Sequence, residues 1–484
     1  MALLAGAKVA YRTELAIMER AQQKQLALYD TLTRSLRPVV SLDGEGYRIY
    51  CCGPTVYRDA HVGNLRTFLL ADMVRRTLLF LGNKVTVVQN ITDVGHMSED
   101  FEEDKMLTSS RIEKRDPFAI ARDYESKFHE DCLAINISRA DHNPRASESI
   151  DLMIDHISRL IADGYAYQGS DGSVYFAAEK FDSYGELSGN RLDALKPGHR
   201  YEYTEGGAKR FHADWALWKS AGSRSEMIWD TPWGRGFPGW HIECSAMSLQ
   251  YLRGHIDLHI GGIDLRFPHH ENERAQSNVV TGDEAVSLWL HGEHLLFEGR
   301  KMSKSAGNVV LVKTLRERGL DPLSLRFALM ENRYRSQMDL SWASLDAAHD
   351  VLRRWRGNYQ RWKSSDAIRD EASISTINSM IEAFCNDLDT PRAMIILRGI
   401  ERNKDLSDGQ KRAIFEDTDQ LFGLDLLRSP ETPPLGAQVE ELLRQRDDAR
   451  RSKDFALSDQ LRDQISEFGI TVKDTADGQV WEYK

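Results

Sequence analysis

From Tyr47 to Asn64 the chain reads YRIYCCGPTVYRDAHVGN, and the fold class follows from this segment and its continuation. Its first six residues alternate in character and end at a Gly-Pro pair, which predicts a buried strand followed by a turn. A helical pattern then runs to a glycine stop at Gly82, and a second β-rich segment starts at Lys84. Strand, helix and strand in this order predict a βαβ unit with a parallel sheet.

The composition is that of a multidomain globular protein. The chain has 484 residues, of which 41% are apolar and 28% charged. No window approaches eighteen consecutive apolar residues and no signal-peptide pattern is present, so we expect no membrane contact. The 63 basic and 74 acidic side chains give a net charge of −11, so the protein could bind nucleic acid only through local basic patches. The odd number of cysteines, five, and their scatter along most of the chain favour a reducing cytoplasm over a disulfide framework.

Beyond the βαβ unit the sheet pattern is interrupted and then returns. Sheet-like segments reappear near 255–262 and 287–291, the chain is mostly helical after 310, and a proline-rich linker precedes the end. We therefore divide the chain into an N-terminal extension (1–25), an α/β domain in two halves (26–97 and 231–310) separated by an insertion (98–230), a mostly helical region after 310 and a small C-terminal domain (437–484).

The segment from Pro54 to Asn64 lies between the predicted strand and helix and ends in HVGN. Amides and the helix dipole at such a helix start attract phosphate, and Gly63 permits close approach of a nucleotide. His61 and Asn64 can donate hydrogen bonds to it. A surface turn with a satisfied histidine is the alternative, and for four residues alone it is the more frequent one.

A second loop, KMSKS from Lys301 to Ser305, carries two lysines and two hydroxyl groups. Lys301 and Lys304 can neutralise the charge that builds on a pyrophosphate leaving group. A solvated basic loop is the alternative for this motif by itself. The two motifs together, in this order and at this separation, strongly indicate nucleotide chemistry.

Thiol, imidazole and carboxylate side chains near the predicted strand ends indicate a metal site. Cys52 ends the first strand, Cys244 lies within GWHIECSAM, and PHHENE is interpreted as a helix start with His269 and Glu273 on one face. These four donors suit Zn²⁺. Scattered cysteines are more often small core residues. Four further side chains remain rival ligands: Cys51, His241, His259 and His270.

The C-terminal domain has a basic cluster despite the acidic total. Five cations lie within ten residues, including Arg450, Arg451 and Lys453, and Trp481 could stack on an unpaired base. The alternative is a solvated amphipathic helix.

Taken together, these motifs resemble one known family. HVGN and KMSKS are similar to the two hallmark loops of class I aminoacyl-tRNA synthetases. The segments CGPTVY from Cys52, GWHIECSAM from Gly239 and FPHHENE from Phe267 resemble cysteinyl-tRNA synthetases specifically. The resemblance runs from about Leu28 to Tyr483, nearly the whole chain beyond the N-terminal extension.

The resemblance implies a Rossmann-like parallel-sheet catalytic domain (26–97 and 231–310) split by the insertion, followed by a stem-contact segment (311–359), a helical anticodon-binding bundle (360–428) and an anticodon-recognition domain (437–484). It implies Zn²⁺ bound by Cys52, Cys244, His269 and Glu273. It implies ATP bound with Mg²⁺ by Thr55, His61, Gly63, Asn64 and Lys304, with Lys301 also catalytic. The implied amino-acid pocket is lined by Gly53, Thr55, Thr92, Trp240 and Asp264.

The implied reaction is the ATP-dependent activation of L-cysteine and its transfer to tRNA(Cys), by a cytoplasmic monomer. Because zinc binds sulfur better than a serine hydroxyl, we predict that the insertion has no editing function. Three alternatives share parts of these motifs. A cysteine ligase of small amines would have no use for an RNA-binding tail, a non-catalytic tRNA-binding paralogue would tolerate loss of Lys304, and a nucleotidylyltransferase would lack the two cysteines.

The sequence departs from the family pattern at three places. Asp93 is followed by VGH, Ile260 interrupts a glycine-rich run, and Cys51 adds a thiol beside Cys52. None of these departures falls on an expected zinc ligand or on a loop lysine.

Overall fold

The computed structural model describes residues 24–94, 105–194, 208–302, 307–429, 436–475 and 478–483. Residues 1–428 form one compact unit and residues 429–484 a second. Several predicted features lie outside the described residues: most of the N-terminal extension, Gly95 and His96, Ser303 to Ser305 with Lys304, and the proline-rich linker. Among the helices that are described, none combines the length and apolar character needed to cross a membrane.

The centre of the first unit is a four-stranded parallel sheet in the order β11-β10-β3-β4. The predicted βαβ unit is confirmed as β3 (Tyr47–Cys51), α2 (Val62–Phe80) and β4 (Val85–Gln89). On the other side of β3, a second strand–helix–strand motif is formed by β10 (Leu258–Gly262), α7 (Glu271–Thr281) and β11 (Trp289–Gly292). The connections leave β3 and β10 in opposite directions, so the carboxyl ends of these strands form a topological switch point, the usual ligand site of such sheets.

Helix α2 packs on the sheet and starts at the switch point. Leu65, Leu69 and Val74 on α2 are at most 1% exposed and belong to the same apolar core as Ile49 of β3. The helix ends as predicted at a glycine, since Gly82 has a φ of +81° that other residues rarely adopt.

The predicted insertion contains two structurally different parts. The chain after α3 (Lys105–Glu113) and α4 (Pro117–Ala134) returns along β4, where the Gln89 amide donates to the His142 carbonyl oxygen (3.0 Å). The second part is an antiparallel sheet in the order β5-β6-β7-β9-β8, next to α5 (Ile150–Ala162). Its strands are β5 (Ala166–Gln168), β6 (Val174–Phe176), β7 (Trp215–Ser220), β8 (Trp229–Thr231) and β9 (Gly234–Pro238).

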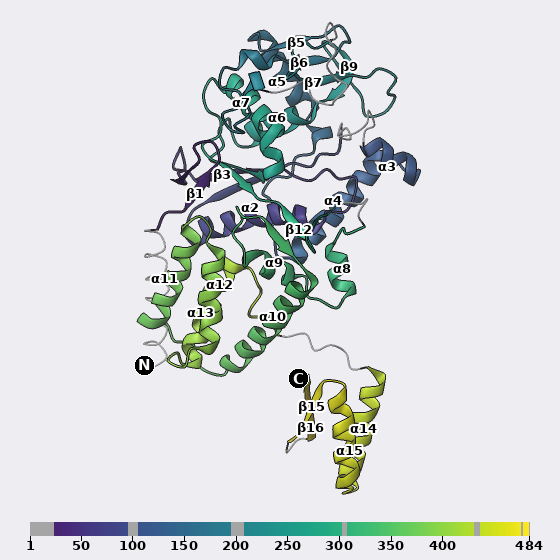
Figure 1. The fold of residues 1–484 in the computed structure, drawn as a ribbon, viewed down its shortest axis with the longest axis vertical. Helices are drawn as coiled ribbons and strands as arrows, with labels where there is room; N and C mark the ends of the chain where they lie inside the picture. The colour runs from purple at the N-terminus through teal and green to yellow at the C-terminus, as the bar shows by residue number, and fades with distance from the viewer. Residues whose placement is uncertain are drawn as a thin grey trace. The chain divides into compact units, whose positions relative to one another are not determined.

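This five-stranded sheet extends to Pro238, beyond residue 230, at which the sequence placed the return to the catalytic domain. The residues of WDTPWGRGFP do not indicate the strands β8 and β9, because glycine and proline are rare within strands. Figure 1 shows the antiparallel sheet at one end of the first unit and the helices after residue 312 at the other, with the parallel sheet between them.

The second half of the first unit is mostly helical, as predicted. Its helices are α8 (Val312–Glu317), α9 (Leu323–Met330), α10 (Trp342–Trp362), α11 (Glu371–Cys385), α12 (Thr390–Arg402) and α13 (Asp408–Phe422). A small sheet of β12 (Leu295–Phe297), β13 (Arg300–Lys301) and β14 (Met338–Leu340) accompanies them, and β1 (Ala27–Asp30) pairs with β2 (Ser35–Pro38).

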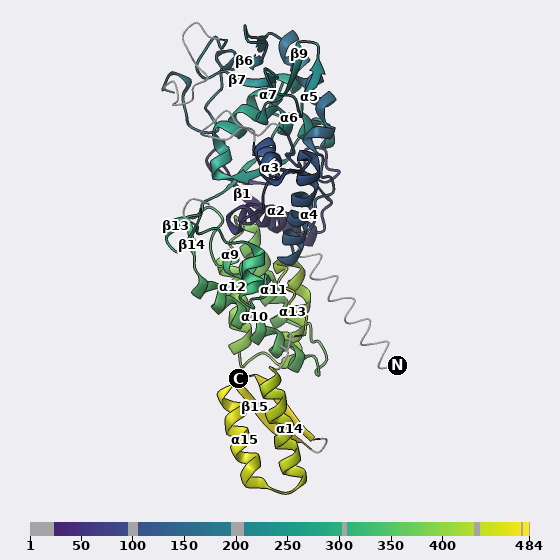
Figure 2. The same cartoon turned by 90° about the vertical axis from the view of Figure 1, so that its right-hand side faces the viewer.

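The second unit packs two helices on a hairpin, as Figure 2 shows. It consists of α14 (Ala437–Arg451), α15 (Phe455–Glu467), β15 (Ile470–Thr475) and β16 (Gly478–Tyr483). Its own apolar core is formed by Val439, Leu443, Ile465, Ile470 and Val472.

Candidate metal centre and nucleotide site

Cys52 and Gly53 directly follow β3 at the switch point. The Cys52 amide donates to the Ile260 carbonyl oxygen of β10 (3.3 Å). The Gly53 amide donates to Oδ1 of Asn90 (2.7 Å), and a Cβ at position 53 would lie 1.6 Å from the Asn90 carbonyl oxygen. Any larger residue at 53 would displace the backbone, so this glycine fixes the position of the neighbouring cysteine.

The four predicted metal donors meet here, although they come from distant parts of the sequence. One ligand atom from each lies within 4.8 Å of the others: Cys52 after β3, Cys244 on α6 (Trp240–Tyr251), His269 before α7 and Glu273 on α7. Glu273 Oε1 is 2.7 Å from His269 Nε2 and 3.6 Å from Cys52 Sγ. All four residues are at most 5% exposed.

The local structure at His269 differs from the predicted helix start. His269 lies in an irregular turn, η5 (Arg266–His270), and α7 begins only at Glu271. The reason is Phe267, whose extended backbone (φ −141°, ψ 134°) interrupts the helical path. His269 and Glu273 nevertheless face one another across this junction.

A second group of donors shares two members with the first. Cys52 and Glu273 also lie close to His259 and His270, whose Nε2 atoms are 3.4 and 3.3 Å from Cys52 Sγ. His259 Nε2 is 3.5 Å from Glu273 Oε2. The centre therefore holds more donors than a tetrahedral ion uses, and two of the four rival ligands remain available.

The other two rivals lie outside both groups. The Sγ of Cys51 is approached by the side-chain amide of Gln89 (3.7 Å). His241 contacts the far side of His269, with 2.8 Å between their Nδ1 atoms, and Trp240 stacks on the same ring at a centroid distance of 4.2 Å. These contacts orient His269, as outer hydrogen bonds do for the ligands of metal sites.

Burial governs the electrostatics of the centre. It raises the pKa of Glu273 and of Cys52 well above their ordinary values and lowers the pKa of His270 well below its own. Burial alone would raise the pKa of Cys244, but the hydrogen bond with Cys52 and the charge and hydrogen bond of His269 together outweigh it and lower that pKa to about 7.

Glu273 Oε2 and His269 Nε2 are buried without a hydrogen bond. Each faces another donor of the centre: His269 Nε2 lies 2.7 Å from Glu273 Oε1, and Glu273 Oε2 lies 3.5 Å from His259 Nε2. A divalent cation would satisfy both atoms by coordination, so this buried group could hold a metal ion.

The first nucleotide motif lies at the N-terminus of α2. His61 is the N-cap: its Nδ1 accepts a hydrogen bond from the Asn64 amide, and Asn64 Oδ1 accepts one from the His61 amide, both at 3.2 Å. Burial lowers the pKa of His61, and the charge of nearby Asp264 opposes this only in part. The imidazole is therefore neutral at pH 7 and can donate through one nitrogen.

The structure brings the two nucleotide motifs together. A Cβ on Gly63 would lie 2.9 Å from Cε of Met302, the second residue of KMSKS. Lys301 ends β13 with an exposed side chain, whereas Lys304 lies outside the described residues. The start of α2 and the described part of the lysine loop thus border the same space.

The predicted amino-acid pocket contains a buried polar network. Thr92 Oγ1 donates to Oε2 of Glu243 (2.9 Å) and accepts from Nδ2 of Asn90 (3.1 Å). Thr55 pairs with Thr92 through a parallel bridge. Glu243 is fully buried and immediately precedes Cys244, so the network adjoins the metal donors. Sequence reasoning missed Glu243, for which a carboxylate between apolar residues of GWHIECSAM was the available signal.

The predicted tRNA contacts in the second unit take part in contacts within that unit. Arg450 and Arg451 form ion pairs with Asp474 (2.9 Å) and Asp447 (2.5 Å). Trp481 packs against the unit's apolar core. Lys453 lies in the turn between α14 and α15, where its φ is +63°.

Two family models match the chain. One, described as "tRNA synthetases class I (C) catalytic domain", matches residues 38–350, and the other, "Cysteinyl-tRNA ligase anticodon binding domain", matches residues 432–481. The structure is similar to Mycobacterium tuberculosis methionyl-tRNA synthetase in complex with methionyl-adenylate, with a TM-score of 0.54 and 14% identity over 78% of this chain and 89% of that chain. At this identity the likeness concerns the fold alone.

Curated relatives cover nearly the whole chain. A Cysteine--tRNA ligase of Thermus thermophilus is 39% identical over 94% of this chain and 99% of its own length. Cysteine--tRNA ligase 1 of Burkholderia lata is 41% identical over 94% of this chain and 96% of its own length. The family models, the relatives and the parallel-sheet architecture agree, and the chain belongs to the cysteinyl-tRNA synthetase family of class I aminoacyl-tRNA synthetases.

Proposed function

We propose that the chain activates L-cysteine with ATP to cysteinyl-adenylate and transfers the cysteinyl group to tRNA(Cys). The observation that carries this proposal is the convergence of two cysteines, a histidine and a glutamate in a buried group beside the switch point. Membership of the family supplies the reaction class, and this group supplies the reason for selecting cysteine.

In our proposal Cys52, Cys244, His269 and Glu273 hold Zn²⁺. The ion, when bound, would stabilise the substrate thiolate by direct ligation, which a serine hydroxyl matches poorly. A pocket that relied on shape could reject serine only weakly, because the two side chains differ little in size. Selection by ligation would thus allow accurate cysteine recognition without an editing domain.

The pocket residues other than the metal donors would orient the part of the bound cysteine beyond its thiol. Trp240 stacks on His269 of the donor group, and the Thr92 hydroxyl is fixed by Glu243 and Asn90. Gly53, Thr55 and Asp264 complete the proposed lining. This arrangement would direct the substrate carboxylate towards the N-terminus of α2.

The start of α2 is the proposed site of ATP, bound with Mg²⁺. His61, Gly63 and Asn64 would contact the nucleotide, while Lys301 and Lys304 neutralise the leaving pyrophosphate. A carboxylate oxygen of cysteine attacks the α-phosphorus, and the bond to the bridging oxygen of the β-phosphate breaks. Positioning and charge stabilisation carry this step, without a protein nucleophile.

In the second step a ribose hydroxyl of the terminal tRNA nucleotide attacks the adenylate carbonyl. A new ester bond forms, AMP leaves with the bond electrons, and the hydroxyl proton is released. Residues 360–428 and 437–484 would bind the anticodon end, with Arg450, Arg451, Lys453 and Trp481 as candidate contacts. Those arginines would have to exchange their aspartate partners for phosphate.

Cysteine-dependent exchange of pyrophosphate into ATP tests the activation step. We expect exchange with cysteine and at least about 100-fold less with serine, the discrimination that ligation gives over shape. Addition of bulk tRNA should then yield cysteinyl-tRNA. Exchange without any transfer to tRNA would instead indicate a ligase that uses another acceptor, and absence of cysteine-dependent exchange would contradict the proposal.

A further inference from the structure

The first turn of α7 is unusual because it is charged and polar yet buried. Glu271, Asn272, Glu273 and Arg274 are consecutive residues, and each is at most 3% exposed. Charged side chains are rarely buried to this extent unless they are paired. Glu273 belongs to both donor groups of the metal centre, whereas Glu271, Asn272 and Arg274 belong to neither. Their partners therefore need a separate explanation.

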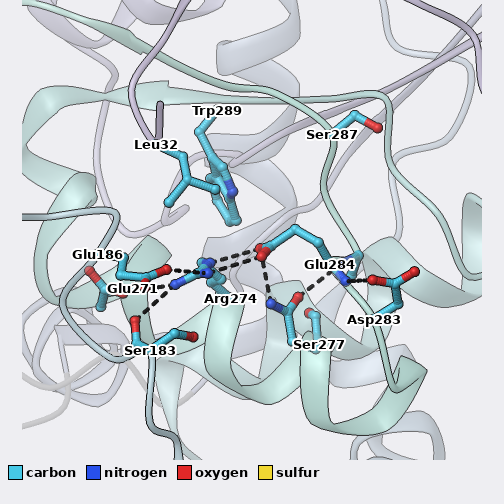
Figure 3. A network of polar contacts seen from close by, with 12 residues as sticks. Leu32, Ser183, Glu186, Glu271, Arg274, Ser277, Asp283, Glu284, Ser287 and Trp289 are labelled. Carbon is cyan, nitrogen blue, oxygen red and sulfur yellow. Dashed lines mark hydrogen bonds and ion pairs between the residues drawn. The ribbon is translucent and has the colours of Figure 1, made fainter. Parts of the chain in front are cut away.

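Arg274 is held by two segments that are distant in sequence, as Figure 3 shows. It forms a bidentate pair with Glu284, whose two oxygens lie 2.7 and 2.9 Å from Nε and Nη2. On its other side it donates to the Ser183 carbonyl oxygen and to the Glu186 carboxylate, both at 3.0 Å. One guanidinium thus joins α7 both to the loop before β11 and to the insertion.

The same insertion segment contacts the two residues that precede Glu273. The Ser188 amide donates to Oε2 of Glu271 (2.7 Å), and the Tyr184 hydroxyl donates to Oδ1 of Asn272 (2.6 Å). Residues 183–188 therefore hold both sequence neighbours of Glu273 and the residue before them. We name this set of contacts, with Glu284, the α7 clamp.

The start of α7 needs such external support. The residues before it form the irregular turn η5, in which Phe267 departs from helical geometry. The direction in which Glu273 projects is therefore not fixed by a preceding regular helix. Side chains that ligate a metal must be held to within about 0.5 Å, and residues beyond the ligands supply that restraint.

We propose that Arg274 is a positioning residue of the metal centre, through which the insertion and Glu284 fix the orientation of Glu273. This inference rests on the proposed function, because it takes the Cys52–Glu273 group as the cation site. It assigns the insertion a role in metal and thiol recognition. The guanidinium of Arg274 makes its hydrogen bonds to Ser183, Glu186 and Glu284, so it acts on the donors through the backbone of α7.

Zinc affinity of the folded chain tests the proposal directly. Competition with a chromophoric chelator gives the dissociation constant for Zn²⁺, and the exchange assay gives KM for cysteine and for ATP. We expect Arg274→Met to weaken zinc binding by about tenfold, the effect typical of residues beyond the first ligands. KM for cysteine should rise with it, while KM for ATP should change less than about twofold, because the start of α2 lies outside the clamp.

Arg274→Lys keeps the charge but cannot bind two carboxylates and a carbonyl in one plane, so its effect should be intermediate. Arg159→Met is the matched control, because Arg159 on α5 also connects the insertion to α7, by donating to the Val280 carbonyl oxygen (2.7 Å). Val280 is seven residues beyond Glu273, about 10 Å along the helix. This variant should keep the wild-type zinc affinity.

A purely structural role would lower the melting temperature of the Arg274 and Arg159 variants and leave zinc affinity unchanged, and that result would overturn the proposal. If Arg274→Met fails to fold, equal zinc affinities of Arg274→Lys and the wild type would overturn it as well. Failure of the proposed function is distinguishable, because it would appear in the wild type as absent cysteine-dependent exchange.

Discussion

At the scale of single residues, Cys244 distinguishes the two donor groups of the candidate metal centre. Only one group contains it, whereas His259 and His270 replace Cys244 and His269 in the other. If Zn²⁺ binds the first group, Cys244→Ser exchanges a soft ligand for a hard one and should weaken zinc binding at least about 100-fold. His259→Asn should weaken it by about tenfold or less. Chelator competition measures both, and the reverse order would assign the ion to the histidine-rich group.

Substitution of Thr92 tests the role of the polar network beside the metal donors. Thr92→Val removes the hydroxyl that Glu243 and Asn90 share and leaves a buried carboxylate without that donor. We expect KM for cysteine to rise by about tenfold, the effect of losing one hydrogen bond to a charged group. Zinc affinity should stay unchanged, and Thr92→Ser should restore KM. A parallel loss of zinc affinity in Thr92→Val would show that the network supports the metal centre instead.

Residue types and their spacing predict much of this site. Cys52 and Cys244 stand out only in combination with the histidines and carboxylate of PHHENE, because scattered cysteines by themselves are more often core residues. Which histidine faces them could not be predicted, because His269 and His270 are adjacent and the irregular turn η5 decides their directions. Arg274 was missed since an arginine in HENERAQ has the pattern of an exposed helix face, although it is 3% exposed.

At the scale of elements, the junction of α2 with the lysine loop depends on the absence of a side chain at Gly63. In Gly63→Ala the new Cβ would lie 2.9 Å from Met302 Cε and 3.0 Å from His61 Nδ1. Alanine normally stabilises a helix over glycine by about 0.5–1 kcal/mol. We expect a melting temperature that is not lowered and an exchange rate that falls by about tenfold, because the cap and loop must shift.

Gly357→Ala provides the control for this element. Gly357 lies within α10, and a Cβ there would meet no atom within 4 Å. This variant should gain stability and keep full exchange activity. If Gly63→Ala behaved in the same way, close approach at the start of α2 would not be needed for activity.

Element patterns predicted the parallel sheet well and the insertion poorly. The strand at 47–51, the helix after it and the strand at 85–89 each carry a local signal, so their pairing could be inferred. The strands at 229–231 and 234–238 are short and contain glycine and proline, so only their pairing with each other and with β7 reveals them. Pairing between distant segments is the information that a local pattern lacks.

At the scale of the first unit, a buried ion pair joins α2 to the helices that follow residue 312. Asp72 on α2 lies 2.8 Å from Nη1 of Arg326 on α9 and 2.7 Å from Nε of Arg76. Arg326 also donates to the Phe422 carbonyl oxygen at the end of α13 (2.7 Å). The side chains of Asp72 and Arg326 are at most 1% exposed. These contacts connect three elements that are widely separated in sequence.

Asp72→Asn should destabilise the first unit by about 3–5 kcal/mol at pH 7, since it leaves a buried guanidinium without its counter-charge. Burial alone would raise the pKa of Asp72, but Arg326 and Arg76 outweigh it and hold the pKa below 3.8. The stability from the ionised carboxylate is therefore complete above the unfolded-state pKa and is lost as pH falls through the lower folded-state pKa. Urea unfolding followed by tryptophan fluorescence should show a wild-type advantage that is full near pH 7 and shrinks below about pH 4. Lys313→Gln, which breaks an exposed ion pair with Glu317, is the control and should lower the free energy of unfolding by less than about 1 kcal/mol. An equally small loss in Asp72→Asn would mean that the Asp72–Arg326 pair does not hold the two halves of the first unit together.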